Sequence, residues 1–459
     1  MANKKTNRKV KKVAKKVAKK YPKIFIAIVI FIAIAVVVLF ILHQTGKITL
    51  PFLPTNKTEE VNKDDNHNHG TNDEHLDDGY VENVIYDDFS IHFLELGNEF
   101  AGDSVYIKAG SLDILVDAGS RGNSATTIEE YVNKYCTDGV LEYVISTHAH
   151  QDHIAGFAGN SSSKAKNFKN ETVGKTGIFY YYDIKNIIDF TYSDEAGTLN
   201  KTQTSATTGT STVYGKYLAA REYAISKGAK YFTAKDLWDN NTHKIALTEN
   251  ITMDVLYNYY YFNKSSDINN YSVCTLFSYN DKHYLLTGDL EKDGEQKLAE
   301  YYDGTTNDKT LPHVELFKAG HHGSRTSSNL CLLDKITPGI CVACCCAGST
   351  EYTVANDTIF PTQEFIDRIA KYTKRVYVTT LFDQENEKNV SMNGNVIISS
   401  NGELVGISAT NNLILLKNTT WFNEEIYLVN GKVKAKASDP FYKETDEGVE
   451  KIKRRVWPS

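Results

Sequence analysis

The sequence of 459 residues predicts an α/β domain tethered behind one N-terminal transmembrane segment. Residues 24–42, "IFIAIVIFIAIAVVVLFIL", form a run without any charge. From residue 89 onward, apolar stretches with strand-like alternation are interleaved with helical patterns, which is typical of α/β domains. Histidines and aspartates recur directly after the apolar runs, where α/β domains carry their functional side chains.

The uncharged run is long enough to cross a hydrocarbon layer ~30 Å thick at ~1.5 Å per residue. A cleaved signal peptide usually has a shorter apolar region of ~7–15 residues and a small-residue cleavage site. The following "HQTGKITLPFLP" holds no such site, so we expect an uncleaved signal anchor. Residues 1–23 hold ten Lys, one Arg and no acidic residue, which predicts a cytoplasmic N-terminus and an extracellular remainder at the cell membrane.

The charge of the chain is unevenly distributed. The whole chain carries −6, so without the eleven basic residues of 1–23 the remainder carries −17. An acidic exterior argues against broad binding to a nucleic-acid backbone, which needs a basic surface. Five segments are expected, in the order 1–23 basic cytoplasmic segment, 24–42 signal anchor, 43–88 acidic flexible linker, 89–405 catalytic domain and 406–459 β-rich extension.

Within residues 89–405 the pattern alternates between strands and helices. Strands are expected at 90–96, 104–110, 113–119, 141–147, 251–261, 272–280, 282–289, 314–320, 374–380 and 394–408. Helices are expected at 126–136, 215–229, 293–302 and 362–372. Residues 160–215 are rich in Ser, Thr, Asn and Lys and predict a surface insertion. Near the end, Asn430-Gly431 predicts a tight hairpin.

The seven cysteines do not form the pattern of a disulfide framework, because their number is odd and four of them lie within "CVACCCAG". No second Cys or His pair stands at zinc-finger distance from this group. We therefore interpret Cys341, Cys344, Cys345 and Cys346 as small residues of a buried strand and turn.

The stretch "ISTHAHQDHIAGF", residues 145–157, concentrates metal-binding side chains. His148 and His150 end an extended run and leave on one side, while Asp152 and His153 begin the following helix. Imidazole and carboxylate ligands suit Zn, Mn or Fe. A single buried His is usually a satisfied core residue, but four such ligands in one turn favour metal binding.

Further candidates stand at the ends of other apolar runs. Asp117 ends "DILVDAG", Asp289 ends "YLLTGD", and the pair His321-His322 follows "LFKAG". A carboxylate at Asp289 could bridge two ions. The recurrence of such residues after apolar runs predicts that they meet at one edge of the fold.

These stretches together resemble the metallo-β-lactamase superfamily. The residues that carry the resemblance are "FLELGN", "GDS", "ILVDAG", "STHAHQDHIAGF", "INNYSVCTLF", "YLLTGDLE", "LFKAGHHGSRTSS", "RVYVTT" and "GNVIIS". They look most like the C-terminal domain of ComEC-type competence proteins and the cell-wall phosphorylcholine esterases. The resemblance spans about residues 89–400 and implies an αββα sandwich.

The resemblance also implies roles for the candidate residues. His148 and His150 would hold one metal, Asp152 and His153 a second, and Asp289 would bridge them. His322 would be the last ligand, His321 would contact the substrate phosphate, and Asp117 would fix a ligand imidazole. Asp152, His321 and Ser324 are the catalytic candidates. Many relatives supply a further His, but His243 and His283, the histidines in that interval, stand in no recognisable context.

The implied activity is that of a metal-dependent hydrolase, most simply a phosphodiesterase acting through a metal-activated water. The cofactor would be one or two Zn²⁺ ions, with Mn²⁺ as a substitute. The implied partner is an extracellular phosphate-containing polymer, either DNA or a cell-wall polymer. The alternatives are a β-lactamase-like amide or thioester hydrolase and a non-catalytic metal-binding surface protein.

Overall fold

A computed structural model describes residues 79–97, 101–191, 205, 209–305, 307–350, 353–383, 386, 388–433 and 449–459. Residues 77–459 form one compact unit. No helix among the described residues is long and apolar enough to cross a membrane. The predicted anchor, residues 24–42, lies outside them, as does most of the predicted linker.

Two large mixed sheets form the body of this unit. The first runs in the order β1 (Tyr80–Glu82), β17 (Val405–Ala409), β16 (Val396–Ser400), β2 (Phe89–Phe93), β3 (Val105–Ala109), β4 (Leu112–Val116), β5 (Val140–Ile145), β6 (Asp183–Asp189) and β7 (Lys230–Thr233). The second runs β15 (Lys388–Ser391), β14 (Val376–Asp383), β13 (Ile340–Ala347), β12 (Leu316–Lys318), β11 (Lys282–Leu286), β10 (Thr275–Tyr279), β9 (Ile251–Val255) and β8 (Lys244–Ala246).

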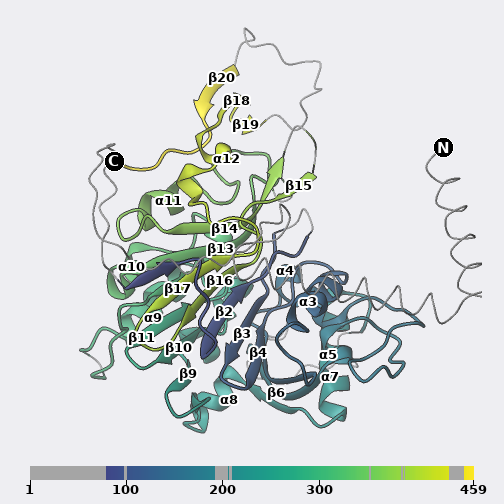
Figure 1. Cartoon of the computed structure of the whole chain (residues 1–459). Coiled ribbons are helices and arrows are strands. Elements are labelled where there is room, and N and C mark those ends of the chain that lie inside the picture. Colours follow the sequence, from purple (N-terminus) through teal and green to yellow (C-terminus); the bar gives the residue numbers. More distant parts are fainter. Residues whose placement is uncertain are drawn as a thin grey trace, which may run out of the picture. The chain divides into compact units, whose positions relative to one another are not determined.

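The sheets pack face to face, with helices on the outside (Figure 1). Phe89 of β2 meets Phe277 of β10 and Tyr284 of β11 at ring-centroid distances of 6.3 and 5.0 Å. The outer helices of the first sheet are α3 (Ser124–Val132), α4 (Gln151–Ala158), α5 (Ile178–Tyr181) and α7 (Val213–Ser226). Those of the second are α9 (Lys292–Tyr301), α10 (Leu330–Ile336) and α11 (Gln363–Ile369). These layers correspond to the predicted αββα sandwich.

The short elements complete the description. They are α8 (Ala234–Asp239), α12 (Thr420–Asn423) and the 3₁₀ turns η1 (Tyr259–Tyr261), η2 (Ile268–Tyr271), η3 (Gly320–Gly323) and η4 (Leu416–Asn418). A small third sheet contains β19 (Lys432–Val433), β18 (Glu425–Val429) and β20 (Val449–Lys453). Asn430 and Gly431 have φ values of 52° and 75° between β18 and β19, so the predicted hairpin is confirmed.

Three boundaries differ from the sequence prediction. β1 pairs in parallel with β17, although residues 80–82 were expected in the linker. A strand of only three residues is too short to show a recognisable alternation of apolar and polar side chains. β17 itself crosses the expected boundary at 405, and β6 lies inside the expected insertion, residues 160–215, as a strand of the first sheet. The polar composition around β6 conceals its apolar Ile187 and Ile188, which are buried in the core.

The cysteine-rich stretch is a buried strand, as predicted. Every residue of β13 is buried, and Cys341, Cys344, Cys345 and Cys346 are free thiols in its interior. Burial raises the pKa of the Cys345 thiol to about 12, which keeps it protonated and unreactive. These residues serve as small core side chains between the second sheet and its neighbours.

Candidate metal centre

The candidate site lies where several strands of the two sheets end. β4 and β5 are parallel neighbours in one sheet, and β11 and β12 are parallel neighbours in the other. Their carboxyl ends are followed by Asp117, His148, Asp289 and the His321-His322 pair respectively. Because parallel strands end at the same edge, four segments far apart in the sequence deliver their polar side chains to one place.

Asp289 is the centre of the cluster. Its Oδ2 atom lies 3.2 Å from Nε2 of His153 and 3.4 Å from Nε2 of His322. The Nε2 atoms of His321 and His148 lie 3.8 and 4.0 Å from the same oxygen. Four imidazoles therefore point one nitrogen each at a single carboxylate oxygen.

The remaining predicted ligands adjoin this group. Nε2 of His148 lies 3.1 Å from Nδ1 of His150, and Oδ2 of Asp152 lies 3.3 Å from Nε2 of His322. Asp152 and His153 begin α4, whose close approach to the β4 end requires Gly156. A Cβ at Gly156 would lie 2.1 Å from the carbonyl oxygen of Ala118. The structure thus brings all six sequence-predicted ligands together.

Asp117 fixes the ring of His153 from behind. Its Oδ2 accepts a hydrogen bond from His153 Nδ1 at 2.7 Å, and Thr147 donates to both of its carboxylate oxygens at 2.8 and 2.7 Å. The Asp117 backbone is left-handed, with φ 59°, at the sharp turn out of β4. Because Asp117 holds the Nδ1 atom of His153, the Nε2 atom of the same ring is directed toward the cluster.

His321 and His322 sit in an unusual backbone conformation. Their φ values are 45° and 54°, in the left-handed region that non-glycine residues seldom adopt. His322 donates from Nδ1 to the carbonyl oxygen of Cys344 at 2.9 Å, whereas His321 contacts Glu291 through Nδ1 at 2.7 Å. We expected only one of the two to reach the ions. Their left-handed turn instead brings both Nε2 atoms near Asp289.

Three further residues of the cluster were not predicted from the sequence. Asp103 lies 3.2 Å from Nδ1 of His322 through Oδ1 and 2.6 Å from Nζ of the buried Lys318 through Oδ2. The Lys318 ammonium also lies 3.8 Å from Oδ1 of Asp289. Glu291 is the third. "GDS" and "KAGHH" contain Asp103 and Lys318, but no local pattern shows that these segments meet.

The charges within the cluster are strongly coupled. Burial alone would raise the pKa of Asp289, but the neighbouring His153, His322 and His321 hold it well below its usual value. Burial alone would lower the pKa of His153, but Asp289 and Asp117 raise it well above its usual value. By contrast, burial lowers the pKa of His148, and the adjacent His153 adds to the effect. The protein therefore places buried negative charge where a cation would be stabilised.

The donor set fits a divalent cation. Asp103, His153, Asp289 and His322 each offer a ligand atom, and these atoms all lie within 4.8 Å of one another. The buried Nε2 of His322 faces the carboxylates of Asp152 and Asp289 at 3.3 and 3.4 Å without hydrogen-bond geometry, which leaves it available to a cation. Nitrogen and carboxylate ligands without thiolate suit Zn²⁺, Mn²⁺ or Fe²⁺.

His243 and His283 are the two histidines that the sequence analysis considered for the further ligand. Their imidazoles make contacts outside the metal-binding cluster. His243 stacks on Trp238 at a ring-centroid distance of 3.8 Å and contacts Asp254 through Nδ1 at 2.8 Å. His283 is 2.9 Å from the hydroxyl of Ser278 through Nδ1. His243 is held by residues of α8 and β9 and His283 by a residue of β10, and neither belongs to a metal-binding group among the described residues.

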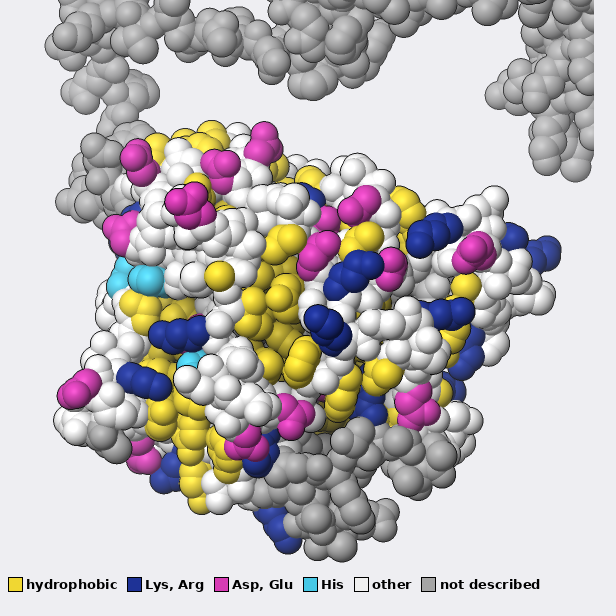
Figure 2. Space-filling model, turned by 90° about the horizontal axis from the view of Figure 1, so that it is seen from below, with side chains coloured by type: hydrophobic (Ala, Val, Ile, Leu, Met, Phe, Trp, Pro, Cys, Tyr) yellow, Lys and Arg dark blue, Asp and Glu magenta, His cyan; other side chains and the backbone are white. Residues whose placement is uncertain are grey.

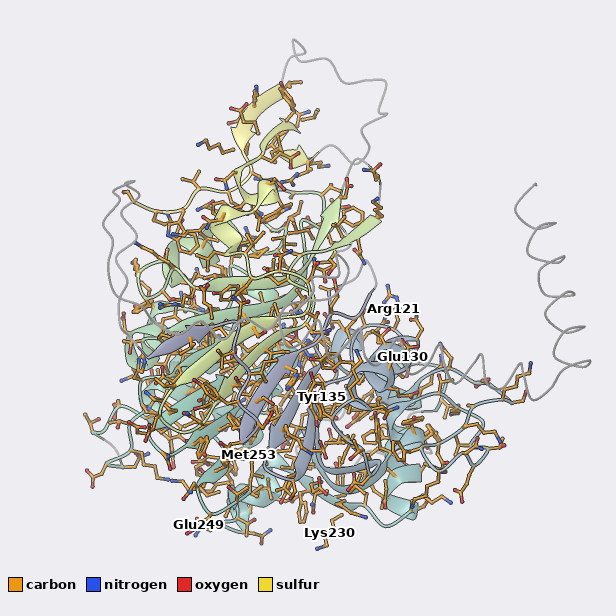
Figure 3. The ribbon with its side chains drawn as sticks, in the orientation of Figure 1. Arg121, Glu130, Tyr135, Lys230, Glu249 and Met253 are labelled. Atoms are coloured by element: carbon orange, nitrogen blue, oxygen red, sulfur yellow. The ribbon has the colours of Figure 1, made fainter. Side chains whose placement is uncertain are left out.

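A cavity of about 940 Å³ opens onto the cluster. His150, Asp152 and His321 of the cluster line it, and Arg121 and Arg325 are among its other lining residues. Figure 3 labels Arg121 at about mid-height on the right of the view, whereas Lys230 and Glu249 lie at the lower end. The predicted catalytic residue Ser324 also lines the cavity, with its Oγ 2.8 Å from Oγ1 of Thr326.

Comparison with known proteins agrees with this geometry. A model described as the metallo-beta-lactamase superfamily matches residues 97–159, which include the turn from His148 to His153. This match covers the part of the chain that carries the turn, and it agrees with the resemblance to the metallo-β-lactamase superfamily. No curated protein matches the chain.

Several solved structures are similar to this chain at low identity. The metallo-beta-lactamase fold protein YhfI from Bacillus subtilis is 10% identical, with a TM-score of 0.33, covering 63% of this chain and 95% of that one. A putative metallo-beta-lactamase from Thermotoga maritima is 18% identical, with a TM-score of 0.25, covering 49% and 87%. A diphosphatase of the PhnP family is 10% identical, with a TM-score of 0.26, covering 55% and 85%.

Proposed function

We propose that this metallo-β-lactamase-fold hydrolase is a phosphodiesterase, anchored in the cell membrane by residues 24–42 with its catalytic domain outside. The observation that carries the chemistry is the convergence of four imidazole nitrogens within 4.0 Å of Asp289 Oδ2, beside a cavity that His321 lines together with two arginines. The anchoring rests on the uncharged run and its basic flank.

The proposed ligands divide into two groups around Asp289. His148 and His150 would hold one cation, and Asp152, His153 and His322 a second, with Zn²⁺ as the expected metal and Mn²⁺ as a substitute. When bound, such ions lower the pKa of water from ~15.7 toward ~7 and neutralise charge on a phosphoryl oxygen. Asp117 keeps the His153 ring oriented for this role through its 2.7 Å hydrogen bond.

The protein supplies the rest of the chemistry through its own side chains. His321 is 24% exposed and lines the cavity, so its ring can contact a non-bridging phosphate oxygen. Glu291 accepts from His321 Nδ1 and thereby directs Nε2 toward the cavity and Asp289. Ser324 offers a further hydroxyl at the same wall. Groups aimed at a developing oxyanion in this way typically contribute ~10²–10³ in kcat each.

The cavity offers polar and charged groups to a substrate. Arg121 and Arg325 line it together with Asp152, Asp267 and Glu291, and Arg guanidinium groups match phosphate geometry. Its hydroxyl-bearing lining residues are Ser324, Thr326, Thr353, Thr358 and Thr362. We propose an extracellular phosphate-containing polymer, either DNA or a cell-wall polymer, as the substrate.

The surface charge bears on the choice between these polymers. Seen from below, the described part of the surface shows Lys and Arg side chains interspersed with Asp and Glu (Figure 2). Residues 24–459 carry −17 in total. Long nucleic-acid backbones bind through continuous basic surfaces, so the negative net charge of residues 24–459 favours the wall polymer.

The test uses the full chain purified in detergent and loaded with Zn²⁺ or Mn²⁺. We expect turnover of bis-p-nitrophenyl phosphate and little or none of a cephalosporin, with Asp289→Asn inactive as the matched control. Single-stranded DNA and p-nitrophenyl phosphorylcholine as further substrates separate the two polymer classes. Hydrolysis of the cephalosporin without any phosphodiester turnover would replace this proposal with the amide-hydrolase alternative.

A further inference from the structure

One wall of the cavity comes from a loop between the second sheet and α11. Thr353, Thr358, Phe360 and Thr362 of this loop line the cavity. The Phe360 ring is half-buried, with its centroid 5.5 Å from that of His321 and 5.9 Å from that of His322. Phe360 is thus the aromatic side chain next to the histidines on which the proposed chemistry depends.

This loop is held in place largely by the C-terminal end of the chain. Arg455 is only 2% exposed, and its guanidinium donates five hydrogen bonds, none of them to a carboxylate. The acceptors are the carbonyl oxygens of Asn356, Ile359, Pro361 and Arg454 and the side-chain oxygen of Asn356. Three of the four carbonyls belong to the loop, on both sides of Phe360.

The hairpin of the C-terminal extension adds a second attachment. Val433 donates its backbone N–H to Val354 O at 2.8 Å, and Asn356 donates to Gly431 O at 3.2 Å. Ile359 is buried in a small apolar cluster with Ile426, Leu428 and Val433. Neighbouring side chains of the loop therefore point to different places, with Ile359 in the extension's core and Phe360 at the cavity.

We propose that the C-terminal extension is part of the substrate site, in which Arg455 is a positioning residue that holds Phe360 as the substrate-contacting wall. A buried arginine surrounded by carbonyls fixes the loop with four directed bonds, a pattern that lysine cannot reproduce. Without these bonds, three loop carbonyls lose their partner and the loop relaxes away from the histidines. The metal-binding residues come from other segments and stay in place.

The inference rests on the proposed function for its kinetic test. In the full chain, we expect Arg455→Met and Phe360→Ala each to raise KM for bis-p-nitrophenyl phosphate about tenfold, with kcat within about twofold, because a shift of this size corresponds to one lost contact. The double variant should be no worse than either single one, since both changes remove the same wall. Arg455→Lys should not restore KM.

Arg454→Met is the matched control. Arg454 precedes Arg455 on the same segment, but its guanidinium pairs with Glu424 at 2.7 Å and lies over the Trp421 ring. We expect KM of this variant to equal that of the wild type. Unchanged KM in Arg455→Met, or strictly additive effects of Arg455→Met and Phe360→Ala, would overturn the inference while leaving the phosphodiesterase proposal intact.

A second measurement is independent of any activity. Hydrogen exchange at amides of residues 353–362 should accelerate in Arg455→Met and remain unchanged in Arg454→Met, with residues 148–158 unaffected in both. A wild-type protein that is inactive on phosphodiesters would refute the proposed function. The hydrogen-exchange rates of the loop would still show whether Arg455 positions it. Equal exchange of the loop in all three proteins contradicts that role.

Discussion

Nδ1 of His321 lies 2.7 Å from Oε1 of Glu291, and this contact separates the role of His321 from that of its neighbour His322. The same Glu291 oxygen accepts hydrogen bonds from Asn269 Nδ2 at 3.1 Å and Thr326 Oγ1 at 3.0 Å. His322, fully buried, instead donates to the backbone of Cys344. One histidine is thus tied to the cavity wall and the other to the core.

This difference predicts distinct outcomes for the two alanine variants. His322→Ala should lower both bound metal and turnover, because Nε2 faces Asp152 and Asp289. His321→Ala should retain metal but lose ~10²–10³ in kcat, the usual contribution of one oxyanion donor. Elemental analysis and steady-state kinetics check both. Metal loss in His321→Ala with retention in His322→Ala would reverse the assignment.

Metal content is the most direct test of the cluster itself. The purified full chain, prepared without chelators, should contain one to two equivalents of a transition metal. Asp289→Asn should lower that content, because it removes the charge shared by all four imidazoles. Elemental analysis measures the bound metal. A chelator-free preparation without any metal would contradict the interpretation of the protein as a metal-dependent enzyme.

Lys318 should be essential for the stability of the metal-free protein. Its ammonium is the cation 2.6 Å from the buried Asp103, and removing one partner of a buried ion pair typically costs ~3–5 kcal/mol. Lys318→Met should lower the free energy of unfolding by about that amount. Denaturant titration of chelator-treated protein measures it.

A compensating variant separates charge from packing. Asp103→Asn in the Lys318→Met background removes the charge left unpaired, so it should recover much of the loss. Lys297→Met is the surface control, since Lys297 pairs with Glu300 in solvent, and it should change stability little. Failure of the double variant to recover any stability would show that lost packing, rather than the unpaired carboxylate, dominates.

Glu129 of α3 should make stability depend on pH. Burial raises the pKa of its carboxyl to about 8, with a smaller contribution from Glu130. A raised folded pKa means that the native state keeps its proton where the unfolded chain has lost it. The free energy of unfolding should therefore fall from about pH 5 to about pH 8, by about 1–2 kcal/mol after allowing for solvent screening of a partly exposed group.

Glu129→Gln provides the comparison, because it keeps the shape of the side chain and cannot ionise. The difference in stability between this variant and the wild type should grow in favour of the variant as pH rises. Thermal or denaturant unfolding at several pH values measures it. Parallel pH profiles for the two proteins would show that Glu129 titrates normally.

The proposed topology has its own test. Because the basic flank precedes the uncharged run, protease added to intact cells should digest residues 44–459 and spare the N-terminal segment. An epitope tag at each end, with a cytoplasmic protein as the control for lysis, reads the result. Full protection of the C-terminal tag would place the catalytic domain on the other side.

The sequence by itself determined the local features of this protein. The alternation of apolar residues predicted most strands of both sheets, and the positive-φ hairpin followed from Asn430-Gly431 alone. Ligand spacing within one turn identified His148, His150, Asp152 and His153, because residues that close in the chain must also be close in space. The position of Asp289 and His322 after apolar runs pointed to the same edge for a similar reason.

Only the tertiary structure decided which distant groups meet. The Asp103–Lys318 pair joins the two sheets, and Arg455 reaches a loop nearly one hundred residues away, at Asn356. The left-handed turn at His321 and His322 brings both rings to Asp289, which their sequence positions alone did not indicate. Periodicity reports which face of an element a residue occupies, whereas these contacts depend on sheet order, backbone dihedrals and how a loop packs, and no local pattern records those.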